Sequence, residues 1–170
     1  NKNLNICFKK IYTGSDKTIK ISIIYIEELT EMDYLSNFII KPLLEMPDFR
    51  NAEREKEVIA LIEAGSLYYP IGNKIKDIDS AVSLLFQGNV LLVFDEESIS
   101  FSFEAKGFDK RNITEPSSEN VIKGPKDSFV EDLMTNIATI RRRIASPDLV
   151  IEKVTLGKQT KTNVALVYHK

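Results

Sequence analysis

Two similar segments near the ends of the chain place the strongest constraint on its fold. Residues 5–25 and 148–168 align without a gap, so that Gly14 matches Gly157 and Tyr25 matches Tyr168. Each segment contains a β-branched run, a polar turn with a glycine and a second apolar run, a pattern that predicts a β-hairpin. The matched glycines and tyrosines favour a structural repeat, and the alternative is a chance similarity between two hairpins.

The residues between these segments alternate between helical and strand patterns. Apolar residues at helical spacing predict helices within residues 30–47, 51–64 and 77–87. Residues 67–71 predict a short strand, which Pro70 confines to a sheet edge because proline has no N–H for the ladder. Residues 90–94 and 98–103 predict another hairpin with one buried face.

A last helix is predicted for residues 127–145, after a long polar stretch that covers residues 106–126. The expected core stripe of this helix consists of Phe129, Leu133, Ile137, Ile140 and Ile144. Acidic residues near its start and three arginines at its end both suit the helix dipole. A polar loop as long as residues 106–126 is more often functional than filler in a compact domain.

We therefore expect an α/β (α+β) fold of two small lobes, with mixed, mostly antiparallel sheets and packed helices. The first lobe is expected to cover residues 1–108 and the second residues 109–170. A helix follows the first hairpin, whereas the sequence ends at Lys170 directly after the second one. This difference leads us to expect a further helix beyond Lys170 in the natural protein.

Charge balance and the scarcity of cysteine exclude several classes of function. The 23 basic side chains against 25 acidic ones give a net charge of −2, which supplies no field for holding nucleic-acid phosphates. The lone Cys7 permits no internal disulfide, and one cysteine with one histidine cannot form a zinc site. No apolar run approaches the ~20 residues needed to cross a bilayer. We expect a soluble piece of a larger protein, without a metal or cofactor.

The sequence contains no catalytic constellation. Glu115 and Glu119 flank two serines, but paired carboxylates catalyse proton transfer only when burial or a neighbour shifts a pKa. No positioned histidine, lysine or nucleophile motif accompanies them. We therefore expect no enzymatic activity, and a structural role in which these carboxylates bind loop amides or one of the arginines.

The arginine triplet, residues 141–143, has two interpretations. It could hold an anionic ligand or a partner's acidic surface, or it could be a solvated helix end matched to the dipole. Successive helical residues point about 100° apart, so the three side chains cannot all serve one site. At most one or two of them are expected to function in binding.

Several motifs together resemble the GerA family, the A subunits of bacterial spore germinant receptors. Residues 112–145 read NITEPSSENVIKGPKDSFVEDLMTNIATIRRRIA, and they follow KPLL at 41–44 and KGFDKR at 106–111. The combination of EPSSE, GP, F-x-E, N and RRR at these spacings is specific to that family. The departures are mild, such as Phe108 where tryptophan is common.

The resemblance implies the context of the whole protein. It would be anchored in the spore inner membrane by a C-terminal region absent from this chain, with this domain on the cytoplasmic (spore core) side. Its partners would be the B and C subunits of the receptor and other A subunits in a homo-oligomer. Its ligand would be a small nutrient such as an amino acid, a sugar or a nucleoside, and it would contribute to the nutrient sensing that triggers germination.

Three functional hypotheses follow. The domain binds the nutrient between its two lobes; or it is an oligomerisation and assembly module that does not bind the nutrient; or it belongs to a paralogous GerA-family protein associated with the dipicolinate channel. The ligand- or partner-binding candidates are Arg111, Glu115, Ser117, Glu119, Asn136, Arg141 and Arg142.

Overall fold

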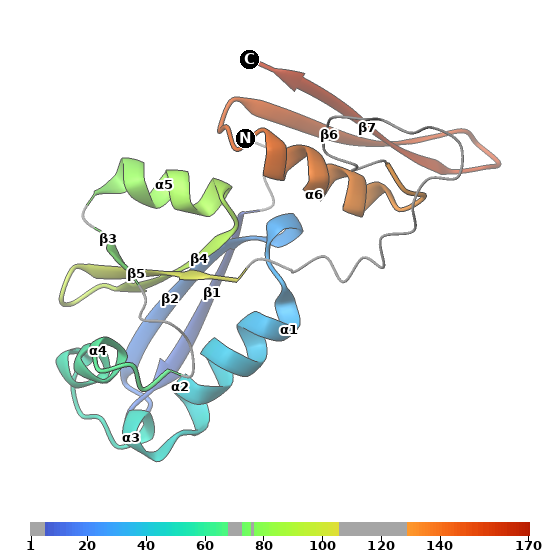
Figure 1. Ribbon diagram of the computed structural model, residues 1–170. Coiled ribbons are helices and arrows are strands. Elements are labelled where there is room, and N and C mark those ends of the chain that lie inside the picture. Colours follow the sequence, from blue (N-terminus) through green and yellow to red (C-terminus); the bar gives the residue numbers. More distant parts are fainter. Residues whose placement is uncertain (1–5, 68–72, 76, 106–128) are drawn as a thin grey trace, which may run out of the picture.

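The computed structural model describes residues 6–67, 73–75, 77–105 and 129–170 (Figure 1). Its elements are β1 (Ile6–Thr13), β2 (Ile19–Ile26), the 3-10 turn η1 (Glu27–Leu29), α1 (Met32–Tyr34), the π-helical turn η2 (Leu35–Ile40), α2 (Lys41–Glu45), α3 (Pro47–Arg50), α4 (Glu55–Glu63), β3 (Asn73–Ile75), α5 (Ile78–Phe86), β4 (Asn89–Phe94), β5 (Ile99–Glu104), α6 (Leu133–Arg143), β6 (Leu149–Leu156) and β7 (Thr162–His169). The predicted combination of helices with antiparallel strands is confirmed.

Five strands form one antiparallel sheet in the order β1-β2-β4-β5-β3. Helices α1 to α4 cover one face of this sheet and α5 covers the other (Figure 1). Alternation along the central strands explains both layers, because successive side chains point to opposite faces. Ile21 and Ile23 of β2 belong to the core under α1 to α4, whereas Ile26 packs with Leu85 and Phe86 of α5.

The helix that follows η1 is continuous through α1, η2 and α2, and Pro42 lies inside it. Proline has no N–H to donate, and its ring clashes with the carbonyl four residues earlier in an α-helix. The widened turn of η2, in which the Lys41 N–H reaches the carbonyl of Ser36, accommodates it. Pro47 instead begins α3, a position at which the missing N–H costs nothing.

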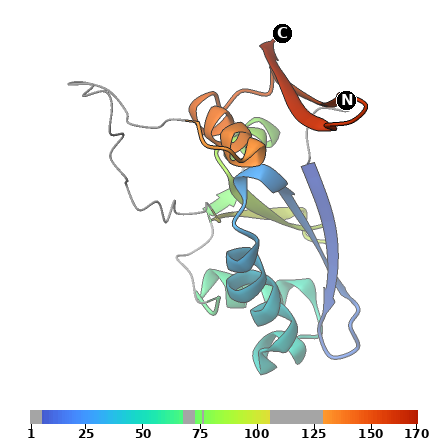
Figure 2. The same cartoon turned by 90° about the vertical axis from the view of Figure 1, so that its right-hand side faces the viewer.

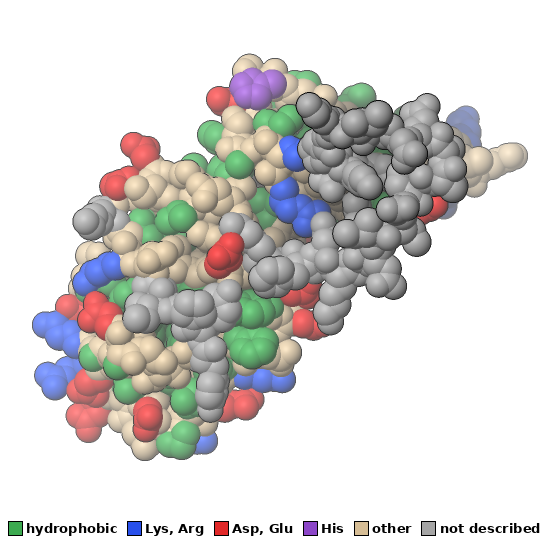
Figure 3. Space-filling view, viewed as in Figure 1, with side chains coloured by type: hydrophobic (Ala, Val, Ile, Leu, Met, Phe, Trp, Pro, Cys, Tyr) green, Lys and Arg blue, Asp and Glu red, His purple; other side chains and the backbone are tan. Residues whose placement is uncertain are grey.

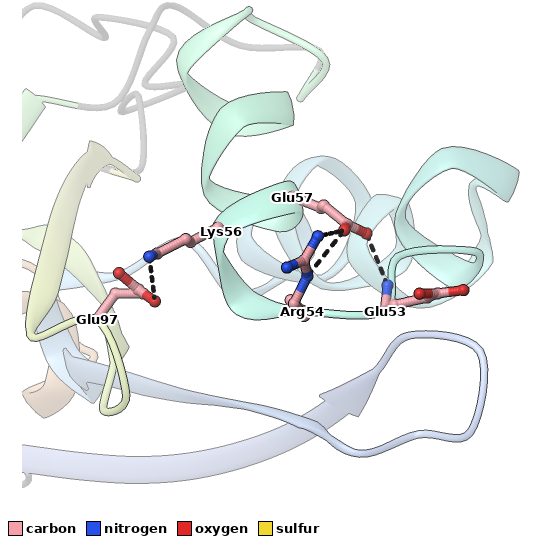
Figure 4. A network of polar contacts seen from close by, with 5 residues as sticks. All are labelled: Glu53, Arg54, Lys56, Glu57 and Glu97. Carbon is pink, nitrogen blue, oxygen red and sulfur yellow. Dashed lines mark hydrogen bonds and ion pairs between the residues drawn. The ribbon is translucent and has the colours of Figure 1, made fainter.

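Polar contacts fix the start of α4 against its surroundings (Figure 4). The carboxylate of Glu57 accepts from the Glu53 N–H at 2.8 Å and from the Arg54 guanidinium at 3.3 Å. Lys56 pairs with Glu97 at 3.6 Å, across to the turn between β4 and β5. These contacts connect the start of α4 to the segment before it and to the β4–β5 turn.

Two strand and helix predictions need correction. Leu67 is buried but not in a strand, the rest of the predicted 67–71 strand lies outside the described residues, and the edge strand is β3. Helix α6 begins at Leu133, not at residue 127, because the extended Asp132 caps it. Consequently Phe129 precedes the helix and is 68% exposed, and Ile144 follows it and is 44% exposed, so neither belongs to the core stripe.

The second sheet is the hairpin of β6 and β7, which packs on α6 (Figures 1 and 2). Its small core unites Ile137 of α6 with Leu149 and Ile151 of β6, with Leu133 and Ile140 packed against them. The matched segments at the two ends thus both form hairpins, but that they are one repeated unit stays a prediction, as does the division at residues 108 and 109. Among the described residues, no helix is both long and apolar enough to cross a membrane.

Candidate functional site at the junction of α6 and η1

Helix α6 lies across η1, so the unit of α6, β6 and β7 meets the five-stranded sheet there (Figures 1 and 2). The end of α6 supplies arginines to this junction and η1 supplies glutamates. The 3-10 turn η1 directly after β2 places acidic residues where that strand ends, and the helix dipole favours basic residues at the end of α6. The two elements therefore meet with opposite charges.

Three charged side chains connect the elements of this junction, and two of them are buried. The Glu28 side chain, only 2% exposed, pairs with Lys153 of β6 at 3.1 Å. Arg141 of α6 is 2% exposed; its burial lowers the pKa of its guanidinium, while the charge of Glu28 acts in the opposite direction. We call Glu28, Arg141 and Lys153 the junction charge cluster. Removing one partner of a buried ion pair destabilises the fold strongly, because the other charge is left desolvated.

Beside this cluster lies a cavity of about 150 Å³, the junction hollow. Its lining residues are Glu28, Leu29, Thr30, Glu31, Gln87, Gly88 and Arg142. The hollow has room for about five waters at ~30 Å³ each. It is well below the ~300–1,000 Å³ of drug-sized sites, so an organic ligand would have to be small.

The polar groups of the hollow differ in charge. Glu31 is exposed and carries a carboxylate, Gln87 carries an amide at the end of α5, and Arg142 carries a guanidinium that donates to Thr139 Oγ1 at 3.3 Å. The Glu31 N–H donates to the carbonyl of Ala105 at 2.8 Å, and Ala105 is the residue that precedes segment 106–128 in the sequence. With Glu28, the lining contains two acids, one base and one amide, a mixture that suits a small ligand with both charges. Within the described residues, no group of three or more His, Cys, Asp or Glu could hold a metal ion.

The structure places three of the predicted site residues, and Arg111, Glu115, Ser117 and Glu119 lie outside the described residues. The Asn136 side chain forms hydrogen bonds with a nearby residue of the chain. Its amide donates to the Val130 carbonyl at 2.6 Å and accepts from the Val130 N–H at 2.8 Å. Arg141 belongs to the charge cluster, and Arg142 lines the hollow. Both arginines lie near Glu28, and a binding role for either one stays a prediction.

Sequence reasoning missed Glu28 and Lys153. Their contact joins positions 125 residues apart, and no local pattern marks either one. Glu27 and Glu28 are adjacent acids after a strand, and in a 3-10 turn the alternation of a strand no longer tells which side chain is buried. Only the packing of α6 on η1 selects Glu28.

Asp132 sets where α6 begins, and its effect should depend on pH. Its carboxylate accepts from the side chain and the N–H of Thr135, both at 2.7 Å, which lowers its pKa. Because the folded pKa lies below the unfolded value of ~3.9, the stabilisation is present above that value and is lost as the pH falls through the folded pKa. Asp132→Ala should therefore lower the melting temperature near neutral pH, with the difference from wild type shrinking in acid.

Thermal unfolding monitored by circular dichroism from neutral to acidic pH tests this. Asp33→Asn serves as the control, since the described residues give the Asp33 side chain no hydrogen bond. A difference between wild type and Asp132→Ala that stays constant down to the most acidic sample would show that the charge of Asp132 does not contribute.

Comparison with known proteins first defines the class. Over 97% of this chain and 58% of the other, the fold resembles the N-terminal domain of the A subunit of the Bacillus megaterium spore germinant receptor GerK3, with a TM-score of 0.65. At 24% identity this likeness concerns the fold alone. The family model described as Bacillus/Clostridium GerA spore germination protein matches residues 1–170. The chain belongs to the GerA family, as its motifs predicted.

Two curated relatives from Bacillus subtilis (strain 168) agree with this assignment. Spore germination protein B1 is 35% identical over 157 residues, covering 92% of this chain and 32% of that protein. Spore germination protein KA is 29% identical over 166 residues, covering 96% of this chain and 29% of that protein. The chain therefore spans less than a third of the length of these relatives.

Proposed function

We propose that this chain is the N-terminal domain of a germinant receptor A subunit, and that it takes part in nutrient sensing by binding a small amino acid in the junction hollow. The observation that carries the proposal is the placement of Glu31 and Arg142 around one small cavity. Family membership and the likeness to a germinant receptor domain support the biological setting. The action is non-covalent and involves no catalysis.

The chemistry of the hollow selects the ligand class. A guanidinium has five N–H donors and binds a carboxylate in a forked geometry, so Arg142 receives the α-carboxylate. The carboxylate of Glu31 receives the α-ammonium, and the Gln87 amide offers a donor and an acceptor to either end. The volume of about 150 Å³ favours a small side chain over a sugar or a nucleoside.

In this proposal, the position of the junction hollow allows ligand binding to change the arrangement of the domain. The hollow is lined on one side by residues 28–31 and by Gln87 and Gly88 after α5, and on the other by Arg142 of α6. A ligand that contacts both sides favours the arrangement in which they lie together, and it shifts the population toward that arrangement by its difference in affinity. In this proposal residues 1–108 and 109–170 are the two lobes. The change reaches the B and C subunits and neighbouring A subunits at the spore inner membrane, with the domain on the cytoplasmic side.

A titration followed by NMR locates the ligand. Glycine, alanine, glucose and inosine are each added to the labelled chain, and the backbone resonances are followed. Glycine or alanine should shift Glu31, Gln87 and Gly88 in a saturable way, because these residues line the hollow. Lys158 in the β6–β7 turn provides the remote reference.

Absence of any saturable shift at the hollow for every compound would contradict nutrient binding here. In that case the assembly-module hypothesis, in which another subunit holds the nutrient, would replace it. Saturable shifts with glucose or inosine but not with the amino acids would contradict the assignment of the ligand class.

A further inference from the structure

A second surface of the molecule, remote from the junction hollow, has the features of a peptide-binding edge. β1 is the outer strand of the five-stranded sheet, and among the described residues it pairs only with β2 (Figure 2). An edge strand presents alternate N–H and C=O groups that have no partner strand. The other edge, β3, has only three residues, whereas β1 has eight. Within the part of the chain that the structure describes, β1 is therefore the longer of the two edge strands and has one side without a partner strand.

A hollow of about 570 Å³ lies beside the second half of β1 and the turn that follows it. Four consecutive β1 residues, from Lys10 to Thr13, help to line it. Successive strand residues point to opposite faces, so lining by four in a row places the hollow beside the strand rather than on one face of the sheet. Leu44 and Arg50 form part of the far wall. A segment lying in the hollow would thus contact the edge of β1 directly.

All charged side chains that line this edge hollow are positive. Lys10, Lys17 and Arg50 line it, and no acidic residue does. None of the three has an ion pair with any residue that the structure describes. The helices around α4 differ, since acidic and basic side chains intermingle there (Figure 3). A hollow whose lining holds three cations and no acid favours an acidic occupant.

We infer that β1 binds an acidic, extended segment of a partner protein, which adds to the sheet as a further strand. Main-chain hydrogen bonds to an edge strand supply affinity in this mode, and alternate side chains supply specificity. Phe8, Lys10 and Tyr12 lie on the same face of β1, and Phe8 is 73% and Tyr12 49% exposed. The segment therefore carries an acidic residue opposite Lys10 and apolar residues two positions to either side.

A second copy of this chain fits the edge poorly. Antiparallel pairing of β1 with itself about its centre sets Lys9 of one copy opposite Lys10 of the other. Like charges directly opposite each other destabilise a strand pair. The positive charge of the edge thus discourages self-association and selects an acidic strand.

The experiment uses a labelled synthetic peptide in which valine, glutamate and valine alternate with threonine, and a matched peptide with lysine in place of glutamate. Fluorescence anisotropy should show binding of the acidic peptide only, and Lys10→Glu should weaken it at least about tenfold. Lys158→Glu, an equal change of charge on the exposed β6–β7 turn, should leave it unchanged. Hydrogen exchange should show new protection of β1 amides when the acidic peptide is bound.

Several results would overturn this inference. They are equal binding of both peptides, equal weakening by Lys10→Glu and Lys158→Glu, and binding without protection of β1 amides. Binding of anionic lipid vesicles in preference to the peptide would assign the cations to a membrane surface instead. None of these results touches the junction hollow, because the two surfaces share no lining residue.

Discussion

Glu28→Gln is expected to lower the free energy of unfolding by about 3 kcal/mol. Removing one partner of a buried ion pair costs about 3–5 kcal/mol, and the lower end applies because Lys153 is partly exposed. The change leaves the buried Arg141 beside a neutral amide. Urea denaturation gives the free energy, and thermal unfolding should show a fall of roughly 2–4 °C per kcal/mol for a domain of this size.

Two further variants separate the charge cluster from a general effect of losing an acid. Glu45→Gln removes an exposed carboxylate at the end of α2 and should change stability by less than about 0.5 kcal/mol. Combining Glu28→Gln with Arg141→Met should cost less than the sum of the single changes, because methionine removes the charge that Glu28 balanced. Strict additivity would mean that Glu28 and Arg141 do not interact.

Phe101→Ala is expected to destabilise the five-stranded sheet by about 3–5 kcal/mol, the cost of truncating a buried aromatic side chain. Phe101 is 1% exposed in the centre of the core and meets Phe94 edge to face with ring centroids 6.2 Å apart. The loss combines the transfer energy of the ring with the cavity left between β5 and the helices above it. Urea denaturation of the variant measures it.

Phe129→Ala is the matched control for this change. The same truncation at a residue that is 68% exposed should alter stability by less than about 0.5 kcal/mol. A cost at Phe129 similar to that at Phe101 would restore the helix of residues 127–145 with Phe129 in its core stripe, and it would contradict the start of α6 at Leu133.

Local periodicity accounts for the parts of the fold that sequence reasoning found. The helix predicted at 77–87 is α5 (Ile78–Phe86), and the hairpin predicted at 90–94 and 98–103 is β4 with β5. The helix prediction depends on apolar residues at helical spacing before a glycine. The hairpin prediction depends on strand alternation on one side of an acidic turn. The turn of the first hairpin is equally local, because Gly14 at φ +89° adopts a conformation that other residues avoid.

Tertiary packing decides the parts that sequence reasoning missed. Both Asp127 and Asp132 precede apolar residues at helical spacing, and the sequence alone does not choose between them as the cap. The same holds for the site. Helical spacing predicted only that the three arginines point in different directions, whereas the contact of Glu28 with Lys153 depends on how α6 and β6 lie against η1.

The most direct test of the central claim is the affinity of the chain for glycine and alanine, measured by calorimetry for wild type, Arg142→Ala and Arg143→Ala. Arg142 lines the hollow, whereas the neighbouring Arg143 is not among its lining residues. Loss of a hydrogen bond to a charged group costs about 1.5–3 kcal/mol, so Arg142→Ala should weaken binding roughly tenfold to a hundredfold, with Arg143→Ala close to wild type. Equal affinities for all three proteins, or no binding to wild type, would contradict the assignment of the junction hollow as a nutrient site.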